Sequence, residues 1–240
     1  MSNFGSDQVA FFLVGGRNLV GSLTTFTDKQ MAVTEPKTVL GDAWRGTAFV
    51  GVRGKEISQE GFYDDAALSQ HEAMSTGPGI SRVLCYTLEG SATGAEFVGM
   101  SGALQVDYER QVELEKLHKA KAMYRGSGIW EQGVTIRTYS PVTSTAATTG
   151  TPVDNGASNT SGGAGYLQLT SFAGATQITP RLLDSADNIT YSALVTFTSA
   201  TAGGYPTAER KAIAGAIQRY VAYDTSGASG SHAWAGLVRT

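Results

Sequence analysis

The sequence predicts a mainly β protein, and three observations carry that prediction. Apolar runs of strand length recur at intervals of about 8–12 residues, with turn-forming residues between them. Glycine makes up 30 of the 240 residues, which suits tight turns. Charged residues make up only 16% of the chain, against roughly 25% in an average domain, so long charged helices are disfavoured.

The first part of the chain is predicted to form a series of short strands. The run "VAFFLVGG" fits a buried strand that ends at Gly15-Gly16, and "LVGSLTTFT" follows with loose alternation. Between residues 29 and 61, strand-like pieces are separated by Pro36 and by several glycines. Further strands are predicted for "SRVLCYTLEG", "GAEFVGMSGALQVDYERQVEL" and "GVTIRTYSPV".

Two segments favour helix. The clearer one is "YDDAALSQHEAM" at 63–74, where Asp64 or Asp65 can accept the free amides of a first turn. The glycines of "GPG" at 77–79 would end that helix. The second segment is "ELEKLHKAKAMY" at 113–124, which suits a short helix by residue propensity.

A change in composition divides the chain. Residues 140–165 consist almost wholly of Ser, Thr, Ala, Gly, Asn and Pro, with Asp154 as the one charge, which is typical of a linker or long surface loop. We therefore expect a domain at 1–140, a linker at 141–163, and a β-sandwich domain at 164–240. In the last part, "RKAIAGAIQRYVAYD" is interpreted as two strands around Gly215, and "HAWAGLVRT" as a closing strand.

Charge and cysteine content exclude several classes of protein. The net charge is −3, and no Lys/Arg patch of the kind that grips nucleic acid is visible. Cys85, the only cysteine, is interpreted as a small hydrophobic core residue in a strand. The N-terminal "MSNFGSDQ" lacks the regions of a secretory signal, and no apolar run reaches membrane-spanning length, so no membrane partner is expected.

The candidate site residues are each better explained by structure than by chemistry. Asp184, Asp187 and Asn188 have the wrong spacing for a calcium loop, and "DSADN" between apolar runs favours a hairpin turn over a ligand loop or a metal site. "GMSGA" at 99–103 fails the G-x-S-x-G pattern of a nucleophile elbow. The other candidates considered are the three histidines and two acid pairs: His71, His118, His232, Asp64 with Asp65, and Glu113 with Glu115. We expect no catalytic, cofactor-binding or metal-binding residue, and therefore no enzyme.

A string of phrases in the same order along nearly the whole chain resembles the major tail tube proteins of long-tailed, siphovirus-type bacteriophages. The phrases are "LVGGRNLVGSLTTFTDK", "TVLGDAW", "ISQEGFYDD", "SRVLCYTLEG", "ALQVDYER", "ELEKLHKA", "TPVDNGAS", "GGAGYLQLTSF", "DSADNITYSALVTF" and "IQRYVAYD". Val112 and Leu114 depart from the family pattern, which is more polar there. The specificity lies in the order of the phrases and not in any one of them.

The resemblance implies a tail-tube β-sandwich or half-barrel with one flanking helix, for which residues 64–74 are the candidate. It implies hexameric rings that stack into a tube in the virion tail, assembled in the host bacterial cytoplasm. The implied partners are identical rings, a tape-measure protein, tail terminator and baseplate proteins, and DNA in transient, non-specific passage. Residues 164–240 would lie outside the tube.

The glycine-punctuated segment from about Thr27 to Ser58 is interpreted as an arm that orders on contact with the next ring. A different reading is a virion surface or receptor-binding β-sandwich, whose loops near Asp187 and Tyr205 would contact sugars. A hydrolase is the third and least supported reading, because no catalytic constellation is present.

Overall fold

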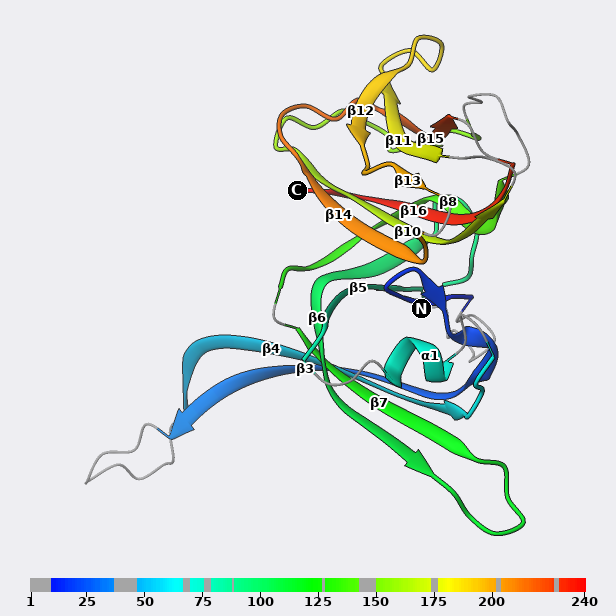
Figure 1. Cartoon of the computed structure of the whole chain (residues 1–240). Coiled ribbons are helices and arrows are strands. Elements are labelled where there is room, and N and C mark those ends of the chain that lie inside the picture. Colours follow the sequence, from blue (N-terminus) through cyan, green and yellow to red (C-terminus); the bar gives the residue numbers. More distant parts are fainter. Residues whose placement is uncertain are drawn as a thin grey trace, which may run out of the picture.

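The computed structural model describes residues 10–36, 47–66, 70–75, 79–87, 89–126, 128–142, 150–173, 177–201, 204–226 and 229–240. These residues form two antiparallel sheets and one short helix (Figure 1). The predicted mainly β fold with one flanking helix is therefore confirmed. Among the described residues, no helix is both long and apolar enough to span a bilayer.

The elements follow one another in an order dominated by strands. They are β1 (Phe12–Val14), β2 (Arg17–Asn18), a 3-10 turn (Val20–Ser22), β3 (Leu23–Pro36), β4 (Thr47–Phe62), α1 (Gln70–Ser75), β5 (Ser81–Tyr86), β6 (Glu96–Gln111), β7 (Lys119–Gly126), β8 (Trp130–Val142), β9 (Val153–Asp154), β10 (Gly163–Ala173), β11 (Gln177–Ser185), β12 (Ser192–Thr196), β13 (Ala200–Thr201), β14 (Thr207–Ile213), β15 (Tyr220–Ser226) and β16 (Ser229–Arg239). The predicted strands around Gly215 and at the end of the chain are confirmed as β14, β15 and β16.

The larger sheet has eleven strands. Its main path runs β14-β10-β16-β8-β6-β5-β1-β2, and a branch continues from the second half of β6 to β7, β4 and β3. The smaller sheet has five strands in the order β12-β11-β15-β9, with β13 paired to β11. The first hairpin turns at Gly15 and Gly16, whose φ angles of 57° and 87° are those that a two-residue turn between strands requires.

The main path curls into an incomplete barrel, and one buried side chain joins β10, next to one end of the path, to the β1–β2 turn and β5 near the other end. Gln168 on β10 accepts the Gly16 amide at 2.6 Å and donates to the Val83 carbonyl at 3.1 Å. A Cβ at Gly16 would lie 2.7 Å from the Leu169 carbonyl oxygen, so only glycine allows this close approach. The barrel interior holds a cluster of buried residues drawn from the strands around it: Phe11, Leu13, Cys85, Phe97, Ala164, Tyr166, Trp234 and Val238. The interpretation of Cys85 as a core residue is confirmed.

Two further hydrophobic clusters lie outside the barrel. One contains Tyr86 of β5, Met100 of β6 and Tyr124 of β7, and it packs the barrel against α1, β4 and β7. The other contains Leu169 of β10 and Leu182 of β11, and it joins the barrel to the five-stranded sheet. The molecule is therefore layered, with the small sheet at one end and the β3-β4-β7-β6 branch at the other (Figure 1).

The prediction of a helix at 113–124 is wrong. Residues 112–118 connect two strands, and the remainder of the segment belongs to β7. Ala120, Ala122 and Tyr124 are buried, while Lys121 and Arg125 between and beyond them are exposed, so the segment has the period of two that a strand requires. Burial of one face of a strand outweighed the helix propensity of Ala and Lys.

The helix predicted at 63–74 exists, but the described helix covers Gln70–Ser75 only. Asp64 accepts the Ala66 amide at 2.9 Å in an extended approach to the helix. Residues 67–69, and 77 and 78 of the predicted stop, lie outside the described residues.

The division into 1–140, 141–163 and 164–240 stays a prediction. Within the expected linker, Val153 and Asp154 form β9 and pair with β15, and residues 143–149 lie outside the described residues. Across the boundary, β16 is hydrogen-bonded to β8, with Leu237 opposite Val134 and Ala233 opposite Ser140.

Candidate assembly surface

The branch of the larger sheet forms a four-stranded layer in the order β3-β4-β7-β6. In this layer Lys29 lies opposite Glu56, Glu56 opposite Arg125, and Lys121 opposite Glu109. One face packs on the core through residues such as Ile57 and Tyr124, which are fully buried. The opposite face is turned to solvent.

Both lateral edges of this layer are open. Among the described residues, β3 pairs only with β4, and residues 106–111 of β6 pair only with β7. An unpaired edge is a row of free amide and carbonyl groups that can pair with another chain. Thr24, Thr25 and Thr27 of β3 are polar and exposed. The β3 edge therefore presents polar side chains, and not an apolar surface, to solvent.

The solvent face of the layer carries alternating columns of charge. By register, four acidic and four basic side chains share this face: Glu56, Glu60, Asp107 and Glu109 with Lys29, Lys119, Lys121 and Arg125. The β7 column is basic and lies between acidic columns on β4 and β6. Lys119 Nζ is 2.6 Å from Glu60 Oε1, and Arg125 Nε is 3.2 Å from Glu56 Oε2. The hydrogen bond and charge of Glu60 raise the pKa of Lys119. Because four acidic and four basic side chains share it, the face is close to neutral overall.

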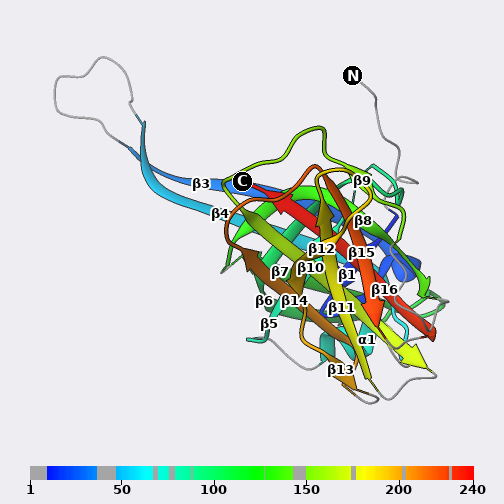
Figure 2. The same ribbon diagram turned by 90° about the horizontal axis from the view of Figure 1, so that it is seen from above.

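Beyond one end of the layer, β3 and β4 continue as a two-stranded ribbon. Ala32 pairs with Arg53 and Pro36 with Thr47, and no described strand flanks these positions. Both views show the ribbon projecting away from the body (Figures 1 and 2). The predicted arm at about 27–58 contains this ribbon, and residues 37–46 at its tip lie outside the described residues.

A buried cation fixes the base of the ribbon. Lys55 Nζ is 2.9 Å from Asp28 Oδ2 and 3.9 Å from the ring centroid of Trp130. The hydroxyl of Tyr86 donates to the same Asp28 oxygen. Burial lowers the pKa of Lys55, although its hydrogen bond and ion pair with Asp28 act in the opposite direction. These contacts join β3 and β4 to β5 and β8 at the base of the ribbon.

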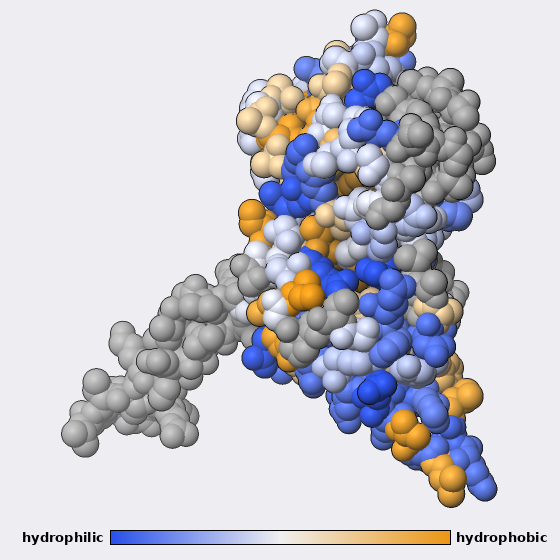
Figure 3. Space-filling model, in the orientation of Figure 1, coloured by the Kyte–Doolittle hydropathy of each residue, from blue (hydrophilic) through white to orange (hydrophobic). Residues whose placement is uncertain are grey.

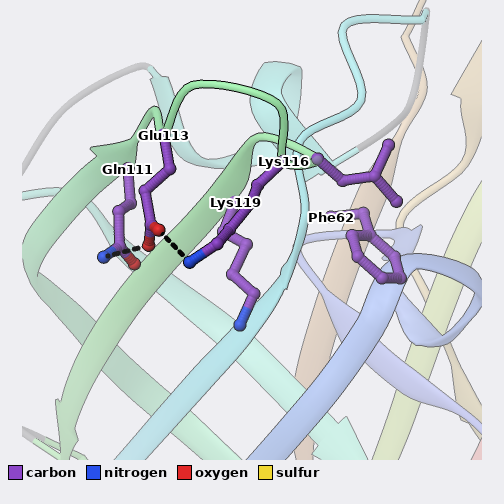
Figure 4. Close-up of a pocket in the computed structure, with 6 residues that line it drawn as sticks. Phe62, Gln111, Glu113, Lys116 and Lys119 are labelled. Atoms are coloured by element: carbon purple, nitrogen blue, oxygen red, sulfur yellow. Dashed lines mark hydrogen bonds and ion pairs between the residues drawn. The ribbon is translucent and has the colours of Figure 1, made fainter.

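At the other end of the layer, the β6–β7 connection carries exposed apolar side chains. Val112 is 67% exposed, Leu114 92% and Leu117 72%, and Phe62 at the end of β4 is 42% exposed. Phe62 and Leu117 line a shallow hollow with Gln111, Glu113, Lys116 and Lys119 (Figure 4). Of the exposed residues, Val112 and Leu114 are the two positions at which the sequence departs from the tail tube pattern.

The acids of "DSADN" lie far from this layer, on the five-stranded sheet. Asp187 accepts the amides of Thr190 and Ile189, both at 2.9 Å, and these hydrogen bonds lower its pKa to about 2. Asn188 has a φ of 63°, so the predicted turn is confirmed for this pair. Asp184 differs, because it is buried in β11 and accepts the Gln218 amide at 2.9 Å.

The other candidate residues are scattered. The His71 ring is 2.8 Å from the Tyr108 hydroxyl, His118 is exposed in the β6–β7 connection, and His232 stands on β16. Glu113 pairs with Lys116. "GMSGA" lies inside β6 and not at a strand-to-helix turn. Within the described ranges, no three His, Cys, Asp or Glu side chains come together as metal ligands would.

The sequence did not reveal the layer itself. The alternation of Lys and Ala at 119–122 was the available signal for β7, and the hydrophobic residues of "VELEKL" were the signal for an exposed apolar connection. The charge columns had no local signal, because Lys119 and Glu60 are 59 residues apart.

Comparison with solved structures finds partial similarities at low sequence identity. No protein-family model and no curated protein matches the chain. The tail of an empty gene transfer agent particle with C6 symmetry aligns at 14% identity and a TM-score of 0.41, over 54% of this chain and 98% of its own. The virion of a native gene transfer agent particle aligns at 14% identity and a TM-score of 0.39, over 53% of this chain and 97% of its own. The third structure is the Dit protein of phage SPP1, described as a paradigm of the hub adsorption apparatus in phages that infect Gram-positive bacteria. It aligns at 13% identity and a TM-score of 0.32, over 95% of this chain and 98% of its own.

Proposed function

We propose that this chain is a non-enzymatic structural subunit of a phage tail tube, in which copies join side by side into rings and the rings stack. The observation that carries the proposal is the four-stranded layer with two open edges. The order of the sequence phrases supports the same role independently of the structure.

The two open edges are different strands, so they favour a head-to-tail contact. The β3 edge of one copy would pair with residues 106–111 on β6 of the next copy. A contact of this kind repeats from copy to copy and closes into a ring when the rotation allows it. A closed ring leaves no edge exposed, which removes the aggregation hazard of β3.

Six copies, the number that the sequence resemblance implies, would contribute 24 strands (six times four). At about 4.8 Å per strand and a tilt near 40°, such a barrel is roughly 50 Å across its backbone. Barrels of about 16–18 strands already hold an aqueous channel. The solvent face of the layer would line this channel, which would hold the tape-measure protein and later conduct DNA.

On this proposal the five-stranded sheet and the rest of residues 164–240 lie on the outside of the tube. The identical ring, the tail terminator and the baseplate proteins would meet the ends of the layer. The protein would be assembled in the host cytoplasm and end in the virion tail.

Electron microscopy of the purified wild-type protein tests the proposal. We expect rings and tubes with an open lumen in negative stain, and sedimentation of a fraction that grows with protein concentration. Monomers or trimers that bind host cells would overturn the proposal in favour of a receptor-binding surface protein. Single rings that never stack would point instead to a hub or cap of the tail.

A lumen that conducts DNA must not bind it, and the acidic columns provide this property. Lys121 lies between Glu60 and Glu109 by register, and Glu60 also pairs with Lys119. The substitutions Glu60→Gln and Glu109→Gln together should leave Lys119 and Lys121 without their acidic neighbours on β4 and β6. We expect a labelled DNA duplex to bind unassembled subunits of this variant at least about tenfold more tightly than wild type near 50 mM salt, and to dissociate near 200 mM salt.

The matched control removes the same amount of charge from outside the lumen face. Glu113→Gln with Glu115→Gln changes two acids of the β6–β7 connection, and we expect DNA binding to stay at the wild-type level. Fluorescence anisotropy measures both variants. Equal binding by the control would mean that net charge, and not the column arrangement, sets the affinity; tight binding by wild type would contradict the role of this face.

A further inference from the structure

The exposed apolar side chains of the described residues are concentrated at one place. Seven large hydrophobic residues are exposed, and four of them surround the β6–β7 connection: Phe62, Val112, Leu114 and Leu117. Figure 3 shows some of the exposed hydrophobic residues of this view at the lower end of the molecule, where Figure 1 places this connection, and others on the upper half. We refer to these four residues as the apolar tip.

The polar side chains of the connection are paired with one another, which leaves the apolar ones facing outward. Lys116 forms an ion pair with Glu113, and Gln111 donates to Glu113 at 3.3 Å (Figure 4). The Lys116 amide also donates to the Glu113 carbonyl at 3.3 Å, and Glu115 adopts a φ of 61°. The tip is therefore a defined turn with outward apolar groups and not a collapsed loop.

Two of the remaining three exposed hydrophobic residues lie toward the opposite end of the same layer. Ile80 is 41% exposed and its carbonyl accepts the Gln105 amide, while Ile129 is 52% exposed and its carbonyl accepts the Ser101 amide. Gln105 and Gln111 are six residues apart on β6, which is roughly 20 Å of strand. Exposed hydrophobic residues thus lie at both ends of the layer, and the ribbon projects from the end that carries Ile80 and Ile129. Ile80 precedes β5 and Ile129 precedes β8, on opposite sides of β6, and we refer to these two residues as the Ile80–Ile129 patch.

We infer that the apolar tip of one copy docks on the Ile80–Ile129 patch of a second copy, beside the base of its ribbon, and that this is the contact between stacked rings. The inference rests on the proposed tube. Strands in a closed barrel end at its two rims, so the tip and the patch would face adjacent rings. A contact between two different surfaces of the same chain repeats without closing and therefore builds a filament along the axis.

The charges around the tip agree with a second copy as the occupant. Glu113 and Glu115 stand beside Arg110, Lys116 and Lys119, so no single sign dominates. An anionic lipid surface would require a basic excess, which the tip lacks. The patch at the other end of the layer supplies an apolar partner of the same chain in equal number to the tips.

The first test separates ring formation from stacking. Leu114→Ser with Leu117→Ser should leave rings of normal diameter in negative stain, with at least a tenfold loss of sedimenting tubes. Ile129→Ser should give the same result from the other side of the contact. Ile189→Ser is the matched control, because Ile189 is 82% exposed but lies in the β11–β12 turn, and it should form normal tubes. Normal tubes from the tip variant would overturn the inference, and so would a folded tip variant that forms no rings.

Mixing the two defective variants gives a sharper outcome. A ring with altered tips keeps its Ile129 patch, and a ring with altered patches keeps its tips. We therefore expect pairs of rings, and no longer stacks, when the two are mixed. Single rings only, or full tubes, would contradict a contact between tip and patch.

Cross-linking tests the contact without requiring tubes. Leu117→Cys and Ile129→Cys made in separate chains should form a disulfide-linked dimer when mixed and oxidised, whereas each alone should form far less. Cys85 does not interfere, because it is fully buried and burial raises the pKa of its thiol. Absence of the mixed dimer would overturn the inference even if wild type forms rings, and its presence without rings would count against the proposed function alone.

Discussion

Replacing Ala32–Arg53 by Asn-Gly is expected to give a folded subunit that forms no tubes. Met31 lies opposite Gly54, so a two-residue turn can close the β3–β4 hairpin at that point. The removed strands pair only with each other among the described residues, and a two-stranded ribbon by itself is marginal in water. The ribbon therefore adds little to the fold of one subunit, and in the proposed tube its length would serve contact with another subunit.

The cut is placed to spare the base of the ribbon. Removing Lys55 would also remove the cation that joins Asp28 to Trp130, so loss of assembly could then reflect damage to the body. Replacing Ser185–Tyr191 by Asn-Gly is the control, because Asp184 pairs with Ser192 and this hairpin lies on the five-stranded sheet. We expect unchanged circular dichroism for both variants, and tubes in negative stain for the control only. Tubes of normal length from the ribbon variant would exclude the arm as a ring contact.

The parts of the fold that depend on local pattern were predictable. The turn at Gly15-Gly16, the turn at Asp187-Asn188 and the strands on either side of Gly215 all follow from residue types within a few positions. The error at 113–124 shows the limit of this reasoning. Ala and Lys favour helix in isolation. In the folded chain Ala120 and Ala122 are both buried, and this spacing of two residues puts them on one face of a strand.

The candidate surface depends on pairings that no local pattern specifies. Gln168 on β10 joins the two sides of the incomplete barrel through a hydrogen bond from the amide of Gly16, 152 residues away. The columns of charge arise from the register of β4, β7 and β6, and a shift by one residue would turn each column to the other face. Sequence reasoning could count these charges and find no basic patch, but it could not place acids beside bases.

Arg210→Met is expected to have the largest effect on the stability of the subunit. Arg210 on β14 donates to both carboxylate oxygens of Glu131 on β8, at 2.7 and 2.6 Å, and the Tyr166 hydroxyl donates to Glu131 at 2.5 Å. The side chain of Arg210 is only 15% exposed and that of Glu131 only 10%. Removing the cation leaves a largely buried carboxylate without its counter-charge, so the free energy of unfolding should fall by about 3–5 kcal/mol. Arg219→Met is the control, because its ion pair with Asp154 is well exposed and should contribute little.

The pH dependence distinguishes loss of the ion pair from loss of packing. Burial acts to raise the pKa of Glu131, but hydrogen bonds from Arg210 and Tyr166 and the charge of Arg210 outweigh it, so the pKa lies below its usual value. In the wild type this contribution is therefore present above the unfolded pKa, about 4.3, and is lost as the pH falls through the lower folded value. In Arg210→Met the hydrogen bond from Tyr166 remains, but the hydrogen bonds and charge of Arg210 are lost, so the pKa of Glu131 should rise above its wild-type value and protonation should relieve the penalty as the pH falls. Urea unfolding at pH 7 and near pH 4 should thus show a smaller difference between wild type and variant at the lower pH. An equal difference at both values would mean that Arg210 stabilises the barrel through the packing of its aliphatic chain, and that the charge of Glu131 has no part in it.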